Sequence, residues 1–440
     1  MPNKAIVVGA GFAGVEAAMQ LARAGIETHL YEMRPVNYSP AHKTADFAEL
    51  VCSNSFKAMR IDSAAGLMKE EMCRLGSICV PVARETAVPA GGSLSVNRED
   101  FSKKITALVE AEPNIIIHRE EVKTIPTEAD AVIIAAGPLV SEALTAEIEQ
   151  LCGTSLHFFD AVAPIVSGDS IDMEKAFPQS RYDRGGEDDY INCPFNKEEY
   201  EAFYEALVNA EGAPQHDFDK RKTGYEGCMP IEVMANRGID TMRYGPMKPV
   251  GLKDPRTGHR PWAAVQLRKE TKEGTMYNLV GFQTNLKWGE QKRVFSMIPG
   301  LEHAEFLRYG VMHRNTFINS PELLGPDYQF KPRPGLYFAG QITGVEGYME
   351  SAMSGILAGA NAARRIQGKE PLILPNYTMC GALTAYISDP YVENFQPMGA
   401  NFGVLPELTD RPRDKRERYA AYSARSLQYF DETNKELAML

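Results

Sequence analysis

A glycine-rich stretch near the start of the chain constrains its fold more than any other feature. Residues 9–14 read Gly-Ala-Gly-Phe-Ala-Gly, and the apolar run 5–8 precedes them. A helix-like pattern follows over residues 12–24 and stops at Gly25, a residue type common at helix ends. Residues 28–32 read as a second strand that ends on Glu32, eighteen residues after Gly14. This order predicts a Rossmann-type unit that holds a dinucleotide pyrophosphate, with the acid on the ribose.

A second strand–glycine–helix unit lies near the C-terminus. Residues 335–341 read as a strand that ends in Ala-Gly-Gln, and a small-residue helix is expected over roughly 349–366, after Gly347. In flavoproteins such a unit passes the flavin, and its helix N-terminus points at the cofactor. Residues 114–118 and 131–138 read as further parallel strands, apolar on both faces.

Because these two units lie at opposite ends of the chain, we expect an α/β fold in which a Rossmann-like FAD-binding domain is split. Residues 1–160 and 331–440 would form this domain, and residues 161–330 an inserted α+β domain. The intervening segment has short strand patterns, many prolines and turn clusters such as residues 184–189. No second G-x-G-x-x-G motif opens a βαβ unit, so a nicotinamide would lack a Rossmann domain of its own.

The composition is that of an ordinary globular protein, with a net charge of −11. That charge argues against a protein that coats nucleic acid generally. No apolar run approaches the roughly 18 residues of a membrane span, and no signal peptide pattern opens the chain, so we expect a cytoplasmic protein. The seven cysteines include no C-x-x-C pair, which argues against a disulfide framework and a metal site.

Two of the cysteines lie in polar, glycine-containing surroundings and are candidates for chemistry. Cys52 lies in Leu-Val-Cys-Ser-Asn-Ser-Phe, and Cys228 lies in Thr-Gly-Tyr-Glu-Gly-Cys-Met-Pro. A reactive thiol needs a partner or a helix terminus that lowers its pKa. For any single cysteine, a buried structural role is the commoner alternative. Cys73, on a helix-like stretch, and Cys79, before an expected Val-Pro strand start, are interpreted as structural.

Basic residues gather in two runs on this acidic chain. Residues 237–272 contain nine basic and three acidic residues, with aromatic residues between them, and residues 411–418 form a second run. A solvated surface of mixed charge is the usual explanation of one such run. Two runs favour a local phosphate-binding face. The expected RNA-binding residues are Arg237, Arg243, Lys248, Lys253, Arg256, Arg260, Arg411, Arg413, Lys415 and Arg416.

Several stretches together resemble the folate- and FAD-dependent tRNA (uracil-5-)-methyltransferases (TrmFO). They are VGAGFAGVEAAMQLARAGIETHLYEMRP, ELVCSNSFK, TGYEGCMPIEVMANRGIDTMRYGPMKPVGL, VGFQTNLKWGEQKRVF and GLYFAGQITGVEGYMESAMSGILAGANAA. The resemblance covers essentially the whole chain, and its central segment is the most specific part. The related carboxymethylaminomethyl-uridine tRNA-modifying flavoproteins share the first and last stretches, but they resemble the chain far less between them.

The resemblance implies a methylenetetrahydrofolate–tRNA-(uracil-5-)-methyltransferase that oxidises NADH or NADPH. Cys228 matches the nucleophile that adds to C6 of uracil, and Cys52 matches a thiol beside the flavin that acts as general base. The one-carbon unit would come from 5,10-methylenetetrahydrofolate, and reduced FAD would convert it to methyl. The implied partner is the T-arm of tRNA, with no membrane and no obligate protein partner. The implied FAD-binding residues are Gly9, Ala10, Gly11, Phe12, Ala13, Gly14, Glu32, Gly340, Gln341, Gly347 and Tyr348.

Other functions are compatible with parts of this pattern. A ribosomal-RNA uracil-5 methyltransferase of the same family would share every catalytic residue. A disulfide reductase needs a redox pair of cysteines that the sequence lacks, whereas an amine oxidase would keep only the FAD site. A flavin-binding RNA-interaction protein without activity would need neither Cys52 nor Cys228.

Overall fold

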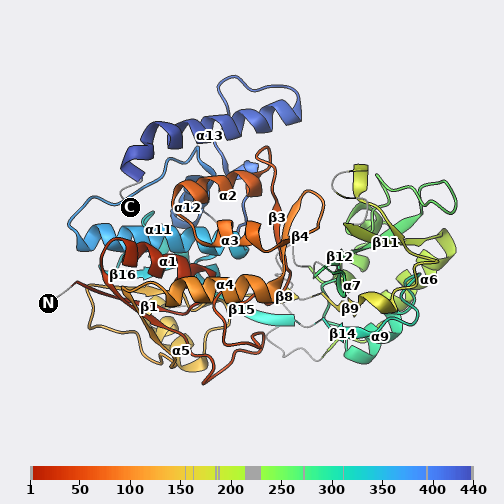
Figure 1. The fold of residues 1–440 in the computed structure, drawn as a ribbon, viewed down its shortest axis with the longest axis horizontal. Coiled ribbons are helices and arrows are strands. Elements are labelled where there is room, and N and C mark those ends of the chain that lie inside the picture. The colour runs from red at the N-terminus through yellow and green to blue at the C-terminus, as the bar shows by residue number, and fades with distance from the viewer. Residues whose placement is uncertain are drawn as a thin grey trace.

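The computed structural model describes residues 3–153, 155–161, 163–183, 186, 189–213, 229–270, 273–310, 312–392 and 395–437. Figure 1 shows two lobes, a larger one around a parallel sheet and a smaller one around an antiparallel sheet. Among the described residues, no helix is long and apolar enough to cross a membrane.

The parallel sheet joins strands from both ends of the sequence. Its order is β16-β7-β1-β2-β6, and every neighbouring pair is parallel. The strands are β1 (Lys4–Val8), β2 (Glu27–Tyr31), β6 (Ile115–His118), β7 (Ala131–Ile134) and β16 (Leu336–Phe338). The pairing of β16 with β7 brings the C-terminal unit beside the N-terminal one, so the predicted α/β class is confirmed.

Helices cover both faces of this sheet, and side chains of β1 and β7 alternate between two apolar cores. One core contains Ala5 and Val7 and lies under α1 (Phe12–Arg23) and α11 (Tyr348–Ile366). The other contains Ile6 and Val8 and lies under α5 (Glu142–Cys152). Strands that are apolar on both faces therefore belong in the middle of the sheet. The edge strand β6 departs from the prediction, because Ile116 is 42% exposed.

The sequence-based boundaries need four small corrections. Strand β2 ends at Tyr31, so Glu32 lies just beyond it, and β6 begins after Asn114. Strand β7 ends at Ile134, and the Gly137 turn leaves the sheet with a positive φ. Cys79 begins helix α3 (Cys79–Glu85), where we expected a strand start. The proline that follows it is tolerated there, because the first helical turn has no hydrogen bond for it to break.

The smaller lobe contains a six-stranded antiparallel sheet of order β10-β11-β12-β13-β9-β14. Its strands are β9 (Ile165–Ser167), β10 (Phe177–Pro178), β11 (Tyr190–Phe195), β12 (Ala263–Lys269), β13 (Met276–Leu279) and β14 (Phe306–Arg308). Its helices are α6 (Lys197–Val208), α7 (Ile231–Ala235), α8 (Thr241–Tyr244) and α9 (Trp288–Phe295). Val265 and Leu267 of β12 lie in the core of this lobe, and Gln266 and Arg268 point to the opposite face.

The chain passes between the lobes along two paired strands. β8 (Ser155–Ala161) pairs antiparallel with β15 (Met312–Ile318). A small antiparallel sheet of β3 (Ser55–Ala58), β5 (Ser93–Val96) and β4 (Ala87–Val88) also lies near the junction. In its β4–β5 turn, the carbonyl oxygen of Ala90 accepts from the hydroxyl of Tyr190 in the other lobe. The backbone N–H of Gly91 donates to the carboxylate of Asp189, also in the other lobe. We propose, on this arrangement, the domain division stated above.

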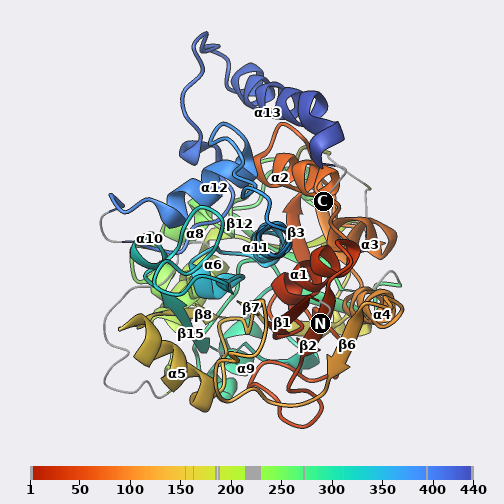
Figure 2. The ribbon, with the colours of Figure 1, turned by 90° about the vertical axis from the view of Figure 1, so that its left-hand side faces the viewer.

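The remaining helices of the larger lobe pack around the parallel sheet and around the helices that cover it. They are α2 (Ala64–Arg74), α4 (Arg98–Glu110), α10 (Ser320–Leu323), α12 (Met379–Ser388) and α13 (Lys415–Leu437). Figure 1 and Figure 2 both show α13 above α2, at the top of the view. The buried carboxylate of Glu71 joins these helices, because it accepts from the backbone of Met379 and Cys380 and from Ser426.

Candidate functional site: two pockets that meet at Tyr348

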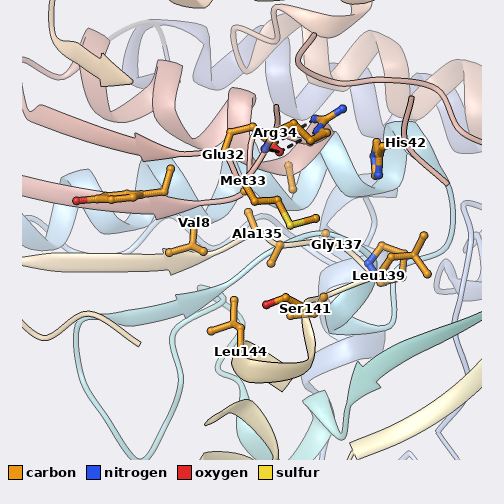
Figure 3. Close-up of a pocket in the computed structure, with 18 of the residues that line it drawn as sticks. Val8, Glu32, Met33, Arg34, His42, Ala135, Gly137, Leu139, Ser141 and Leu144 are labelled. Atoms are coloured by element: carbon orange, nitrogen blue, oxygen red, sulfur yellow. Dashed lines mark hydrogen bonds and ion pairs between the residues drawn. The ribbon is translucent and has the colours of Figure 1, made fainter. Parts of the chain in front are cut away.

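A first pocket runs along the carboxyl ends of β1, β2 and β7 (Figure 3). Its empty space, part of it open to solvent, amounts to about 1040 Å³. Ligands of open α/β sheets bind at this edge, outside the carboxyl ends of the strands.

The predicted glycine turn forms one wall of the first pocket, and each glycine in it has a separate geometric role. Gly9 has a φ of +101°, and a Cβ there would lie 2.5 Å from the carbonyl oxygen of Ala135. A Cβ on Gly14 would overlap the carbonyl oxygen of Gly9, so Gly14 lets α1 pack against the turn. Gly11 differs, because a Cβ there would meet no atom within 4 Å. Gly11 lines the pocket and therefore leaves room for a ligand.

Glu32 lies in the first pocket as the sequence predicts, and a buried arginine holds it there. Its carboxylate accepts from the backbone of Ala10 at 3.0 Å and from Nε of Arg34 at 2.8 Å. Arg34 also contacts Glu49 at 2.9 Å (Figure 3 shows Glu32 and Arg34). Burial alone would raise the pKa of Glu32, but the hydrogen bonds and charge of Arg34 outweigh burial and lower that pKa. Glu32 is therefore an anionic acceptor at neutral pH.

The C-terminal unit closes the other end of the first pocket. Gly340 and Gln341 follow β16, and Tyr348 begins α11; all three line the pocket. Of the eleven residues expected to bind FAD, those that line this pocket are Gly9, Gly11, Phe12, Ala13, Glu32, Gly340, Gln341 and Tyr348. Ala10 acts through its hydrogen bond to Glu32, Gly14 packs inside α1, and Gly347 lines a second pocket instead.

The second pocket lies between the two lobes, on the other side of Tyr348. The larger lobe contributes Cys52, Lys57, Glu350 and their neighbours, and the smaller lobe contributes residues of β12, β13 and the turn after β13. Tyr348 lines both pockets. Its ring packs against Phe12 at 4.8 Å and edge-on to Phe56, so it forms a shared wall.

Cys52 is in direct contact with that wall. Its Sγ lies 2.9 Å from the hydroxyl of Tyr348, and its backbone N–H donates to the same oxygen at 2.8 Å. Burial, together with the charge of Cys52, raises the pKa of Tyr348 well above its ordinary value. Tyr348 therefore stays a neutral phenol, which can donate a hydrogen bond to a thiolate and stabilise it.

Arginines from both lobes hold the segment that carries Cys52. Arg98 donates to the carbonyl oxygens of Leu50 and Cys52, and Arg308 donates to that of Val51. Arg268 donates to Asn54 at 3.1 Å and to Ser53 at 2.9 Å. Sequence reasoning missed Arg98 and Arg308, because nothing local to either residue marks it as a contact of residue 52.

Lys57 and Glu350, which the sequence also did not single out, form an ion pair of 2.7 Å in the second pocket. Glu350 is 1% exposed, and Lys57 has a φ of +64°, a conformation that side chains rarely adopt. Nearby, burial lowers the pKa of Lys69 to about 8, and its ammonium donates to the carbonyl oxygen of Phe56.

Cys228 lies outside the described residues. The described chain resumes at Met229, and the backbone N–H of Ile231 donates at 2.7 Å to the carbonyl oxygen of Gln283. Gln283 lines the second pocket. The chain that follows Cys228 is therefore attached to the wall of the pocket that contains Cys52.

The ten basic residues expected to bind RNA all lie at least partly at the surface. Several have acidic neighbours: Arg243 pairs with Asp240, and Arg411 with Glu407. Arg243 also lies 3.8 Å above the ring of Trp262. Two basic residues of the first run, Arg268 and Lys269, are not at the surface, because they are buried in β12. Both faces of β12 are buried because the strand lies where the two lobes pack together. The number of charges in the sequence does not indicate this burial.

The other cysteines occupy positions suited to packing. Cys79, Cys193 and Cys380 are buried, and burial raises the pKa of each thiol, which makes it inert. Burial also raises the pKa of Cys73. Among the described residues, no cluster of histidine, cysteine and carboxylate side chains could hold a metal ion.

The chain matches known proteins over most of its length. A family model described as glucose inhibited division protein A (GIDA) matches residues 4–370. A methylenetetrahydrofolate–tRNA-(uracil-5-)-methyltransferase TrmFO from Enterococcus faecalis is 57% identical over 97% of this chain and 98% of its own. A protein of the same name from Desulforamulus reducens is 58% identical over 98% of this chain and 97% of its own.

A solved structure has the same fold at a much lower sequence identity. GidA of Aquifex aeolicus, in its form I crystal, superposes with a TM-score of 0.71 at 18% identity. The match covers the whole of this chain and 76% of that protein.

Proposed function

Because the chain belongs to the TrmFO family of methylenetetrahydrofolate–tRNA-(uracil-5-)-methyltransferases, we propose that it methylates C5 of a uridine in tRNA with a folate one-carbon donor. We propose further that the target is the T-loop uridine, which becomes ribothymidine, and that the reaction needs FAD and NADH or NADPH. Two relatives that are 57% and 58% identical to this chain are methylenetetrahydrofolate–tRNA-(uracil-5-)-methyltransferases by name, which supports the folate-dependent methylation of tRNA. The second proposal rests on the site and on the sequence resemblance.

One observation carries the proposal: a thiol lies where the two pockets meet. Cys52 contacts Tyr348, and Tyr348 lines both the first pocket and the second. A dinucleotide in the first pocket and a nucleobase in the second would therefore both lie close to this thiol. That is the arrangement which a reductive transfer of carbon requires, since the cofactor, the base and a proton acceptor must meet at one point.

The first pocket fits FAD. The turn at Gly9 and Gly11 would hold the pyrophosphate at the N-terminus of α1, and Glu32 would accept from the ribose hydroxyls. Gly340 and Gln341 would lie at the flavin end. When bound there, FAD supplies the electrons that convert the captured one-carbon unit to a methyl group. Nicotinamide and folate would use the open face of the flavin in turn, because the sequence offers no second dinucleotide motif.

The thiols would act in sequence on the uracil. Cys228 is proposed as the nucleophile that adds to C6, a step that makes C5 reactive toward the one-carbon unit. Cys52 is proposed as the base that removes the C5 proton. Tyr348 would stabilise its thiolate by a hydrogen bond, and the neighbouring guanidinium groups of Arg98 and Arg268 would favour the charged form.

Two other functions share these features, and nucleoside analysis separates them. A strain that lacks this gene should lose 5-methyluridine from tRNA and regain it when the wild-type gene is restored. Loss of the same nucleoside from ribosomal RNA alone would favour the rRNA alternative. Loss of a different uridine modification would favour an oxidoreductase of the sister tRNA-modification family. Intact 5-methyluridine in both RNAs would refute the proposal.

A further inference from the structure

Two buried polar side chains in the second pocket each have a donor nitrogen without an acceptor. Arg268 is 7% exposed and Asn278 is 3% exposed, and both line the pocket. Within the described part of the chain, the only hydrogen bonds of Arg268 are those from Nε and Nη2, which leaves Nη1 without an acceptor. Nδ2 of Asn278 is fully buried and has no partner there either. A fully buried donor is nearly always paired, so the unpaired Nδ2 of Asn278, beside a guanidinium nitrogen that no described side chain engages, indicates a ligand that accepts from both.

The charge of Arg268 is also without a counter-ion. No carboxylate of the described residues lies within ion-pair distance of its guanidinium. Glu270, the residue after the end of β12, is held by Arg98 at 2.6 and 3.2 Å. Arg34 and Arg98, by contrast, each have a carboxylate partner. Burying an arginine without an acid costs free energy, and a negative charge that develops beside it recovers part of that cost.

The two side chains lie next to each other and face the same way. Arg268 on β12 and Asn278 on β13 are directly opposite in the antiparallel register. Side chains of such a pair point to one face of the sheet, with Cβ atoms about 5 Å apart. Arg268 is hydrogen-bonded to Ser53 and Asn54, which directly follow Cys52 in the chain. The unpaired donors therefore lie beside the proposed base.

We propose that Arg268 and Asn278 are catalytic residues that bind the O4 oxygen of the target uracil and stabilise the enolate formed there. The inference rests on the proposed function, since it names the site of the uracil within the second pocket. O4 is favoured over O2 because Cys52 is assigned to the C5 proton. C5 is bonded to C4, so the base and the O4 site must be neighbours.

The donors act on the step in which the thiolate adds to C6. The sulfur electron pair forms the S–C6 bond, the C5=C6 pair becomes the C4=C5 double bond of the enolate, and the C4=O4 π pair becomes the negative charge on O4. No proton is lost and no electron is transferred. Arg268 stays protonated, because its hydrogen bonds to O4 strengthen as the charge grows. Two donors placed on an oxygen that becomes anionic favour the transition state over the bound substrate.

The test measures how fast a covalent adduct forms with tRNA that contains 5-fluorouracil at the target. Asn278→Asp keeps the shape of the side chain but replaces its amide donor with a carboxylate that would pair with Arg268. Arg268→Gln removes the positive charge of the guanidinium. Each variant should slow adduct formation by about 100-fold or more, the usual effect of losing one such donor. Bound FAD, flavin reduction by NADH or NADPH, and tRNA affinity should stay at wild-type values. Arg268→Lys should recover part of the rate.

A matched control separates this role from simple support of the Cys52 segment. Arg308→Gln removes another arginine that holds the same segment, but Arg308 does not line the second pocket. It should therefore slow adduct formation far less than Arg268→Gln does, whatever it does to methylation through Cys52. Equal slowing in Arg308→Gln and Arg268→Gln would make Arg268 structural and overturn the assignment. Altered flavin reduction in Asn278→Asp would place the two donors on the cofactor instead, which would also overturn it.

A substrate change tests the assignment without altering the fold. In tRNA whose target carries 5-fluoro-4-thiouracil, the weaker acceptor at position 4 should slow adduct formation by the wild-type enzyme. The same sulfur substitution should slow adduct formation by Asn278→Asp little further, because the sulfur in the substrate and the aspartate in the enzyme remove the same hydrogen bond. If the sulfur substitution slowed adduct formation by the same factor in Asn278→Asp as in the wild-type enzyme, the proposal would be overturned. Failure of the wild-type enzyme to trap 5-fluorouracil tRNA would instead count against the proposed function.

Discussion

At the scale of single residues, the site depends on how each buried charge is balanced. The carboxylate of Glu32 is held by Arg34, and that of Glu270 by Arg98. Arg268 has no such partner among the described residues and lies at a pocket. Because burying a charge without a partner costs free energy, balanced pairs hold the structure, and an unpaired charge that faces a pocket is suited to act on a ligand.

The first residue-scale prediction concerns Gly11. Gly11→Val should give folded but colourless protein, because a Cβ at this position would meet no atom within 4 Å and the side chain would extend into the first pocket. Circular dichroism would check the fold, and the visible spectrum would check for FAD. Gly92→Val is the matched control, since Gly92 also has open space around it and lies outside that pocket. Yellow Gly11→Val protein with unchanged FAD affinity would refute the assignment.

The second residue-scale prediction separates the two thiols. Cys228→Ala should lose both methylation and the denaturant-resistant adduct with 5-fluorouracil tRNA, because no sulfur is left to bond C6. Cys52→Ala should lose methylation but still form that adduct, with weakened FAD binding as an additional effect. Gel electrophoresis under denaturing conditions reads out the adduct.

Variants of the structural thiols provide the control for this prediction. Cys73→Ala and Cys79→Ala should change stability at most, because both thiols have raised pKa values and neither lines a pocket described here. If Cys52→Ala lost the adduct and Cys228→Ala kept it, the two roles would have to be exchanged.

At the scale of elements, the contact between α1 and α11 fixes how the two pockets meet. Gly355 and Gly359 of α11 lie against Ala13 and Ala17 of α1, and the backbones are so close that a methyl group does not fit. α1 begins at the glycine turn, and α11 begins at Tyr348. The small residues therefore set the distance between the pyrophosphate end of the first pocket and its shared wall.

Gly355→Ala should accordingly destabilise the protein and weaken FAD binding together. A Cβ at this position would overlap the carbonyl oxygen of Ala13, and overpacking of this kind costs about 1–3 kcal/mol. Urea unfolding with and without added FAD measures both effects. Gly289→Ala is the control, because Gly289 lies in helix α9 with open space around it and should be neutral or slightly stabilising. Unchanged stability of Gly355→Ala would contradict this account of the packing.

At the scale of the whole molecule, the arrangement of the lobes brings together parts that are far apart in the sequence. The Cys52 segment belongs to the larger lobe, and Arg268 and Arg308, which hold it, belong to the smaller one. The second pocket exists only between the lobes. Activity should therefore depend on both lobes being present and docked, even though each has a core of its own.

A whole-molecule prediction concerns the RNA-binding face. If the two basic runs contact phosphates, tRNA binding should weaken steeply with salt, and each contact removed should lower the log–log slope by about one. Charge reversal at Arg256, Arg260, Arg413 and Lys415 would test this by binding measurements at several salt concentrations. Lys103 and Lys104, exposed on α4 outside both runs, provide the control reversal. An unchanged slope in the four-site variant would identify the runs as solvated surface.

The sequence alone determined the two strand–glycine–helix units of the larger lobe, and the reason is local. The glycine turn, the strand that precedes it and the helix that follows it are specified by neighbours within a few residues. The same holds for the unit around Gly340, and the position of the two units at opposite ends of the chain indicated that they combine in one domain. The parallel sheet that pairs β16 with β7 confirms this part of the prediction.

Only the tertiary structure decided which side chains surround Cys52. Arg98, Arg268, Arg308 and Tyr348 are 46 to 296 positions away from the residues that they contact in the segment 50–54. Sequence periodicity reports which face of an element is buried, but it does not report which element lies opposite. In the sequence, Arg268 is therefore one of the charges of a basic run expected at the surface. In the structure, it is buried where the two lobes pack together. Burial, and not residue type, turned that side chain into part of the site.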